Sequence, residues 1–183
     1  MHPQLVETLR EAQRFGFFGG GDIVEAVEHA RSFVEAIGPL SVGARLVDLG
    51  SGGGLPGLVL ADIYRDNPVL LLDRRQKRTD FLERACRRLG YGHVTVMVAD
   101  VRRLIDDVRF GSTERFDAVT ARGFGPAAFT LRTAVALCRP DGRIVISEPP
   151  AGDRWPTELL AELHLTSERV GAVRRFQFTT TST

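Results

Sequence analysis

Lysine is nearly absent from this sequence, since Lys77 is the only lysine among 24 lysine and arginine residues. Cysteine and histidine are also scarce, with Cys86 and Cys138 far apart in apolar stretches and four histidines scattered along the chain. These absences argue against a zinc site or a disulfide framework, so we expect no bound metal and two reduced, buried cysteines. No run of about 18 apolar residues occurs, so we expect no membrane-spanning helix.

The basic residues are therefore almost all arginines, whose planar guanidinium groups bind phosphate and carboxylate in a bidentate way. A compositional bias is the alternative explanation for them. The net charge is only +1, so overall charge does not by itself indicate a nucleic-acid binder. Residues 1–7 lack the basic and apolar segments of a secretory signal, which predicts a cytoplasmic protein. The length of 183 residues predicts one domain, and we expect a monomer.

Short apolar runs alternate with amphipathic segments along most of the chain. Helices are expected at residues 5–12, 23–37, 56–65, 79–89, 127–137 and 157–163. Strands are expected at residues 45–49, 69–73, 94–98, 116–121, 143–147, 165–170 and 174–180. This order predicts an α/β fold with a mostly parallel seven-stranded sheet, one antiparallel edge strand and helices on both faces. Residues 1–44 would form a short helical cap on a core of residues 45–183.

A glycine-rich segment follows the first predicted strand and leads into a helix. Gly50, Gly52 and Gly54 form a GxGxG pattern directly after Asp48, and Pro56 is suited to open the helix. Such a strand–loop–helix unit places a ligand crevice at the carboxyl edge of a parallel sheet. The same residues also fit the dinucleotide pattern GxGxxG from Gly52 to Gly57, so the loop alone leaves two cofactor classes open.

Two further acids narrow that choice. Asp73 ends the second predicted strand, where a carboxylate can accept both ribose hydroxyls, and Asp100 follows the third, where it can hold an adenine amino group. Asp73 suits a nicotinamide enzyme equally, but the whole series favours S-adenosylmethionine (SAM) and a Rossmann-like, class I SAM-dependent methyltransferase fold. Structural alternatives remain: Asp48 can cap local backbone, and Asp73 can cap the following helix.

More specific motifs accompany the loop. Residues 54–58 read Gly-Leu-Pro-Gly-Leu, residues 71–82 combine Leu-Leu-Asp with Gln-Lys-Arg and Phe-Leu, and residues 119–124 read Val-Thr-Ala-Arg-Gly-Phe. In these motifs the chain resembles the bacterial 16S ribosomal RNA guanine-N7 methyltransferase family, also called glucose-inhibited division protein B. The resemblance covers residues 15–147. It implies a cytoplasmic transferase in rRNA processing, whose partner is ribosomal RNA or the small ribosomal subunit.

The resemblance also implies site residues. Five positions match family residues that contact SAM: Gly50, Leu55, Val101, Arg102 and Arg122. Arg122 follows the fourth predicted strand and is the substrate-side candidate, although a surface arginine paired with an acid is the alternative. The resemblance assigns no catalytic residue. Arg75, Lys77 and Arg78 are candidates for contacts to RNA phosphates, and a solvated helix face is their alternative.

The chain also departs from the family pattern. Arg31, the pair Arg102-Arg103 and the pair Glu148-Pro149 replace other residues of the family, and about 44 residues precede the first predicted strand. These departures suggest a divergent, N-terminally shortened member. They keep two alternatives open, a SAM-dependent methyltransferase of a small molecule or protein and a SAM-binding domain without catalysis.

The expected chemistry agrees with what the sequence lacks. Guanine N7 has a free lone pair and carries no proton, so its methylation requires alignment of the two reactants and no general base. The predicted strand at 116–121 is not followed by the Asn/Asp-Pro-Pro-aromatic motif of enzymes that methylate exocyclic amino groups. No Pro-Cys motif of pyrimidine carbon-5 methylation occurs either.

Overall fold

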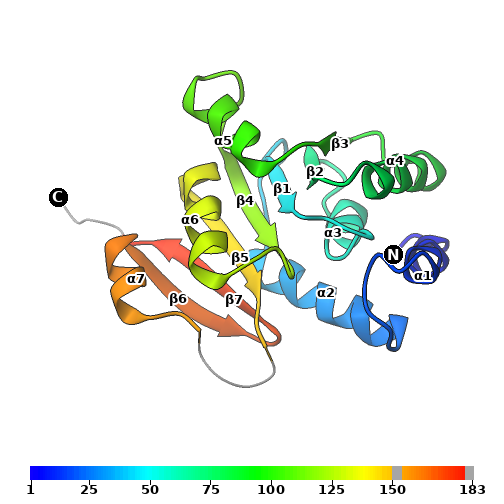
Figure 1. Cartoon of the computed structure of the whole chain (residues 1–183), viewed down its shortest axis with the longest axis horizontal. Coiled ribbons are helices and arrows are strands. Elements are labelled where there is room, and N and C mark those ends of the chain that lie inside the picture. Colours follow the sequence, from blue (N-terminus) through cyan, green and yellow to red (C-terminus); the bar gives the residue numbers. More distant parts are fainter. Residues whose placement is uncertain (150–153, 180–183) are drawn as a thin grey trace.

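The computed structural model describes residues 1–149 and 154–179, which form one sheet between two layers of helices (Figure 1). The strands are β1 (Leu46–Leu49), β2 (Val69–Asp73), β3 (Val94–Val98), β4 (Phe116–Ala121), β5 (Cys138–Ser147), β6 (Leu165–Val170) and β7 (Val173–Phe178). The helices are α1 (Leu5–Arg14), α2 (Ile23–Ile37), α3 (Gly57–Ile63), α4 (Gln76–Leu89), α5 (Val101–Arg109), α6 (Ala127–Leu137) and α7 (Thr157–Glu162).

The seven strands lie in the order β3-β2-β1-β4-β5-β7-β6. Strands β1 to β5 pair in parallel, and β7 pairs antiparallel with both β5 and β6. The predicted α/β fold with one antiparallel strand is therefore confirmed. That strand is β7, and it lies one place inside the edge because the tight turn at Gly171 places β6 outside it.

Each face of the sheet carries its own apolar core. Side chains alternate along β1, so that Leu46 packs with α1 to α4 while Val47 and Leu49 pack with α5, α6 and α7. The fully buried Phe33 and Phe81 belong to the first core, which α2, α3 and α4 cover. Because both faces are covered, the inner strands β1, β2 and β4 are mostly apolar and buried, whereas β6 and β7 carry polar and charged residues.

The two N-terminal helices differ in what they cover. Helix α2 packs against α3, β5 and β7, so it belongs to the layer on one face of the sheet. Helix α1 packs on the outside of that layer, against α2 and α4. The predicted cap is thus partly an integral helix of the core, because Val27, Ala30 and Phe33 of α2 form one buried stripe.

The predicted elements differ from the structure mainly after β3. Helix α5 was not predicted, although Asp100 caps it and Leu104 and Val108 follow Val101 at helical spacing. Val101, Leu104, Ile105 and Val108 follow the complete helical pattern of i, i+3, i+4 and i+7, so the sequence does contain the signal for this helix. Helix α4 begins three residues before the predicted Thr79, and β5 begins at Cys138 rather than at residue 143.

Both cysteines are free and buried, as predicted. Burial raises the pKa of each thiol to about 12, so both remain neutral and unreactive at neutral pH. In the part of the chain that the structure describes, no helix combines the length and the apolar composition needed to span a membrane. Within the same residues, no three His, Cys, Asp or Glu side chains lie together as metal ligands would.

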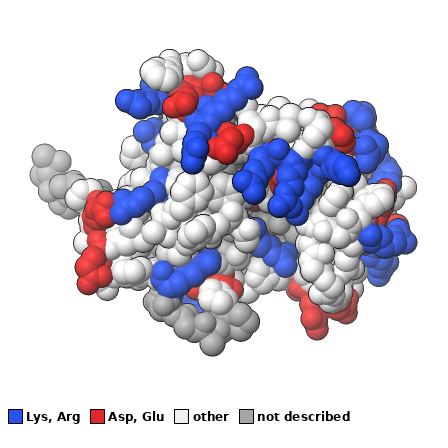
Figure 2. Space-filling view, viewed as in Figure 1, with Lys and Arg blue, Asp and Glu red and all other residues white. Residues whose placement is uncertain are grey.

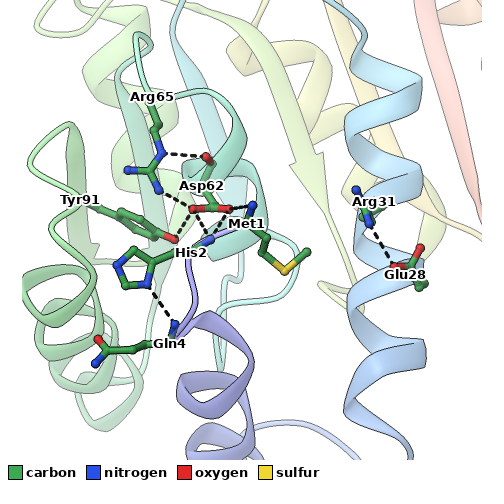
Figure 3. Close-up of polar contacts among 8 residues, drawn as sticks. All are labelled: Met1, His2, Gln4, Glu28, Arg31, Asp62, Arg65 and Tyr91. Carbon is green, nitrogen blue, oxygen red and sulfur yellow. Dashed lines mark hydrogen bonds and ion pairs between the residues drawn. The ribbon is translucent and has the colours of Figure 1, made fainter.

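A buried carboxylate fixes the start of the chain to the core (Figure 3). Asp62, at the end of α3, accepts hydrogen bonds from the backbone nitrogen of His2 at 2.9 Å, from Arg65 Nη2 at 2.6 Å and from the Tyr91 hydroxyl at 3.0 Å. Burial alone would raise the pKa of Asp62, but the hydrogen bonds from Arg65, His2 and Tyr91 outweigh it and lower the pKa below the ordinary 3.8. The charged form is therefore the native one.

We expect Asp62→Ala to reduce the free energy of unfolding by about 2–3 kcal/mol, because three donors lose a charged acceptor. Arg65 is half exposed, which keeps the loss below that of a fully buried pair. Since the pKa is lowered in the folded state, this stabilisation is complete above the unfolded pKa and disappears as the pH falls through the folded pKa.

Urea unfolding at neutral pH and near pH 3 measures both effects. The matched control is Glu28→Ala, whose partner Arg31 lies at 3.3 Å on the exposed face of α2 (Figure 3). Its effect should stay within about 0.5 kcal/mol. Equal losses in the two variants would contradict the anchoring role of Asp62.

Candidate functional site

A cleft of about 310 Å³ opens at the carboxyl ends of β1, β2 and β3 and at the segment that follows β4. Strand β1 lies between β2 and β4. The chain leaves β1 and β2 toward one face of the sheet, through α3 and α4, and leaves β4 toward the other face, through α6. Open parallel sheets bind ligands at such a switch point. The cleft is lined by Gly50, Leu72, Asp73, Arg74, Arg75, Arg78, Ala99, Asp100, Val101, Arg102, Gly123, Phe124 and Phe129.

The glycine loop forms the floor of this cleft only in part. Gly50 lines it with φ of +69°, and a Cβ atom at this position would lie 2.8 Å from the Phe124 ring. Gly52 lies beside the cleft with φ of +57° and donates its backbone N–H to Asp73. Gly54 and Leu55 are instead buried under the loop, where Gly54 packs against Leu58. The loop backbone therefore borders the cleft at Gly50, whereas Gly54 and Leu55 support the loop from the core.

Asp73 lines the cleft at the end of β2 and also holds the loop in place. Its Oδ2 accepts the Gly52 N–H at 3.0 Å and lies 3.5 Å from Arg78 Nη1, while its Oδ1 accepts the Arg75 N–H at 2.9 Å. The side chain is almost completely buried. A carboxylate has about four acceptor positions, so Asp73 retains capacity for one ligand hydroxyl. Asp73 therefore lines the cleft and bonds the backbone that leads into α4, but it does not cap the helix, whose N-cap residue is Arg75.

Asp100, Val101 and Arg102 lie on the opposite wall, where β3 leads into α5. Asp100 caps the helix, because its Oδ1 accepts the Arg102 N–H at 3.0 Å. Val101 is buried and presents an apolar surface to the cleft, and Arg102 lines the rim. The structure thus brings all three predicted residues together with Asp73.

Asp48 and Arg122 do not line the cleft. Asp48 is 1% exposed at the end of β1, on the side of the sheet that α2 and α3 cover, and its Oδ1 accepts the Thr120 hydroxyl at 2.7 Å. Burial raises the pKa of Asp48 to about 6, although the Thr120 hydrogen bond opposes this effect. Burial likewise lowers the pKa of Arg122, and the charge of Asp48 opposes that shift.

The two groups are close enough to influence each other but are incompletely bonded. Asp48 Oδ2 and Arg122 Nη1 are buried and make no hydrogen bond within residues 1–149 and 154–179. The Gly57 backbone N–H at the start of α3 is nevertheless close enough to Asp48 to lower its pKa. His29 of α2 lies in the same region, where its own burial and then the Arg122 charge lower the pKa of the imidazole. Unsatisfied buried charges are costly, and the opposite charges of Asp48 and Arg122 offset part of that cost.

Arginines surround the mouth of the cleft. Arg75 and Arg78, two of the three predicted RNA contacts, line it, whereas Lys77 is exposed on α4 outside the lining. Arg74 and Arg102 also line it. Figure 2 shows basic side chains gathered over the region where β2 leads into α4 and over α5. Within the described ranges, Arg74, Arg75 and Arg102 form no side-chain ion pair, so their charges are available to a ligand.

Two aromatic side chains complete the lining and were missed by sequence reasoning. Phe124, after β4, and Phe129, in the first turn of α6, stack with ring centroids 5.9 Å apart and an interplanar angle of 18°. A phenylalanine after β4 belonged to the motif at residues 119–124, but nothing in the sequence indicated that α6 would place a second ring over it.

Comparison with known proteins gives consistent matches. The family model described as "GidB: rRNA small subunit methyltransferase G" matches residues 22–151. A protein of Sorangium cellulosum (strain So ce56), "Ribosomal RNA small subunit methyltransferase G", is 40% identical over 120 residues, which cover 66% of this chain and 48% of that protein. The protein of the same name from Halorhodospira halophila (strain DSM 244 / SL1) is 40% identical over 118 residues, covering 64% and 51%.

The chain spans about half the length of these two relatives. A solved structure, the precorrin-6y C5,15-methyltransferase of Geobacter metallireducens GS-15, matches with a TM-score of 0.62 at 12% identity, over 88% of this chain and 92% of that one. Likeness at this identity concerns the fold alone, and it confirms the predicted class I methyltransferase architecture. The matched residues 22–151 include every residue that lines the cleft.

Proposed function

The chain belongs to the GidB family, rRNA small subunit methyltransferase G, and on this premise we propose that it transfers a methyl group from SAM to guanine N7 of small-subunit ribosomal RNA. The observation that carries the proposal is that the family match spans the whole cleft at the strand ends. The residues of this cleft and of the buried pair behind it offer groups for each part of SAM and for an RNA acceptor.

The adenosine part of SAM fits the cleft. Asp73 would accept a ribose hydroxyl with its remaining acceptor position, and Asp100 would accept the adenine amino group. Val101, Leu72 and Phe124 supply apolar surface for the adenine ring. Gly50 would let the backbone approach the ligand closely, since its lack of a side chain leaves room beside Phe124.

We propose that the buried pair behind the loop, Asp48 and Arg122, holds the amino-acid part of SAM. Asp48 Oδ2 and Arg122 Nη1 are both buried without hydrogen-bond partners within the described residues. The ammonium and carboxylate of SAM have the opposite charges, so each would satisfy one of these atoms by a charge-assisted hydrogen bond. Arg122, which follows β4, would then bind the carboxylate of SAM.

SAM supplies an electrophilic methyl group on a sulfonium, and the chain's own residues only have to align it with the acceptor. Guanine N7 carries no proton, so no residue needs to act as a base. Among the described residues, the lining includes no histidine or cysteine, and its two carboxylates, Asp73 and Asp100, accept backbone N–H groups. Holding two reactants in line can contribute roughly 7–11 kcal/mol to the lowering of the barrier.

The rim of the cleft favours a polyanionic acceptor over a small neutral one. Arg74, Arg75 and Arg102 lie at the mouth without ion-pair partners in the described ranges, and Arg78 lies beside them. Guanidinium groups in this position would bind phosphates of the RNA backbone and position the base over the cleft. Lys77 would add a contact farther along α4.

The direct test is methyl transfer from labelled SAM to small-subunit RNA that lacks the modification, followed by nucleoside analysis. We expect label in 7-methylguanosine, and large-subunit RNA serves as the control that should remain unlabelled. Label in another nucleoside, in protein or in a small molecule would reject guanine N7 of this RNA as the acceptor. SAM binding without transfer to any acceptor would favour a non-catalytic SAM-binding domain.

A further inference from the structure

Both rings of the stacked pair Phe124–Phe129 line the cleft, but they differ in exposure. Phe124 is half-buried and lies against Gly50, where a Cβ atom would come within 2.8 Å of its ring. Phe129 is 45% exposed, although it lines the same cleft. A ligand inside the cleft therefore meets Phe124, and a group that approaches from outside meets Phe129.

Phe129 combines exposure with a favourable electrostatic setting. Single exposed aromatic side chains are common on protein surfaces, and Phe129 differs from the exposed Phe110 in that it lines the cleft. The first turn of α6 contains no acidic residue that would repel a phosphate. Arg74, Arg75 and Arg102 lie around the same opening. An aromatic face next to guanidinium groups is the combination that binds single-stranded nucleic acid, through base stacking and phosphate contacts respectively.

We propose that Phe129, supported from behind by Phe124, is the platform on which an unpaired base of the RNA acceptor stacks at the mouth of the cleft. The stacked Phe124 ring fixes the orientation of Phe129, so the platform is preformed and little conformational entropy is lost on binding. The arginines hold the phosphates on either side of that base. This inference rests on the proposed function, because it assumes that RNA is the acceptor.

The test separates the base from the backbone. Binding of a single-stranded RNA oligonucleotide is measured beside binding of the same sugar–phosphate chain with abasic positions, for the intact chain and for Phe129→Leu and Phe129→Trp. We expect Phe129→Leu to weaken binding of the base-bearing RNA by about tenfold and to leave the abasic chain unchanged. Phe129→Trp should retain the affinity of the original residue. Arg75→Gln should weaken binding of both chains alike.

The matched control is Phe110→Leu, since Phe110 is 74% exposed at the end of α5 and does not line the cleft. It should change neither affinity. The affinity for SAM, measured by calorimetry, should be the same for Phe129→Leu and the original chain. A loss of SAM affinity in Phe129→Leu would overturn the inference, because Phe129 would then hold the adenine of the cofactor.

Equal losses for the base-bearing and abasic chains would also overturn it, as would the absence of RNA binding by the original chain. The methyl-transfer assay keeps this result separate from the proposed function. If the original chain methylates RNA and Phe129→Leu binds it normally, only the platform is rejected. If selective loss occurs for base-bearing RNA but no methyl is transferred, the platform stands and the proposed activity fails.

Discussion

Gly50→Ala should weaken SAM binding by roughly ten- to a hundredfold. Gly50 has φ of +69°, where an alanine costs about 1–2 kcal/mol, and its Cβ would lie 2.8 Å from the Phe124 ring. The Phe124 ring can relieve the contact by turning away, which removes it from its place in the cleft, whereas the backbone strain is relieved when the loop leaves the conformation that borders the cleft. Binding must then restore that conformation at a cost of about 1–3 kcal/mol, which is the expected loss in affinity.

Calorimetry with SAM and thermal unfolding measure this prediction. The matched control is Gly43→Ala, because Gly43 has φ of +80° but open space around its Cβ position. This control carries the backbone strain without the contact, so it should lower stability by about 1 kcal/mol and leave SAM affinity unchanged. Unchanged SAM affinity in Gly50→Ala would show that the loop does not contact the cofactor.

Asp48 should make SAM affinity depend on pH below neutrality. Burial raises the pKa of Asp48 to about 6 in the free protein, and the cationic ammonium of SAM would favour its ionised form. SAM affinity should therefore fall up to tenfold for each pH unit below about 6. Asp48→Asn should remove this dependence and weaken binding at pH 7.5 by roughly ten- to a hundredfold, the value of a charge-assisted hydrogen bond.

The raised pKa of Asp48 also predicts how the stability of the free protein depends on pH. The effect is opposite to that of Asp62, because ionisation of Asp48 destabilises the folded state. Because the folded pKa of Asp48 exceeds its ordinary value of 3.8, ionisation of Asp48 destabilises the folded state. The cost is complete above about pH 6, amounts to about 3 kcal/mol, and disappears as the pH falls through 3.8. Asp48→Asn should therefore stabilise the free protein at neutral pH while it weakens SAM binding.

The exposed aspartate Asp66 provides the control, and Asp66→Asn should change neither stability nor SAM affinity. A flat affinity profile between pH 5 and pH 7.5 in the original chain would contradict a role for Asp48 in binding the cofactor. A lower free-protein stability of Asp48→Asn at neutral pH would show that the carboxylate is satisfied inside the fold.

The inner strands could be placed from the sequence because they are short apolar runs, and Asp73 and Asp100 could be found because these acids end or follow such runs. Strands β6 and β7 alternate apolar with polar or charged residues, so their signal was weaker. The sequence does not show on which side of the sheet a residue that follows a strand places its side chain. Arg122 follows β4, but its side chain lies near Asp48 and does not line the cleft. Gly54 and Leu55 are buried beneath the loop. A residue that belongs to the family motif therefore need not line the cleft.

Tertiary packing accounts for what the sequence did not predict. The stack of Phe129 on Phe124 depends on the angle at which α6 leaves the loop, and no local pattern encodes that angle. Helix α5 is different, because its cap Asp100 and its apolar residues at helical spacing are visible in the sequence, and it carries Val101 and Arg102 into the cleft. The unpaired atoms of Asp48 and Arg122 became visible only when every neighbour was in place.

The central claim is that the cleft at the strand ends, together with Asp48 and Arg122, is a SAM site. A calorimetric titration at pH 7.5 with SAM and, separately, with a nicotinamide dinucleotide tests it most directly, because the glycine pattern by itself is compatible with both. We predict binding of one SAM per chain and no measurable binding of the dinucleotide. Binding of the dinucleotide, or no heat with SAM, would contradict the claim.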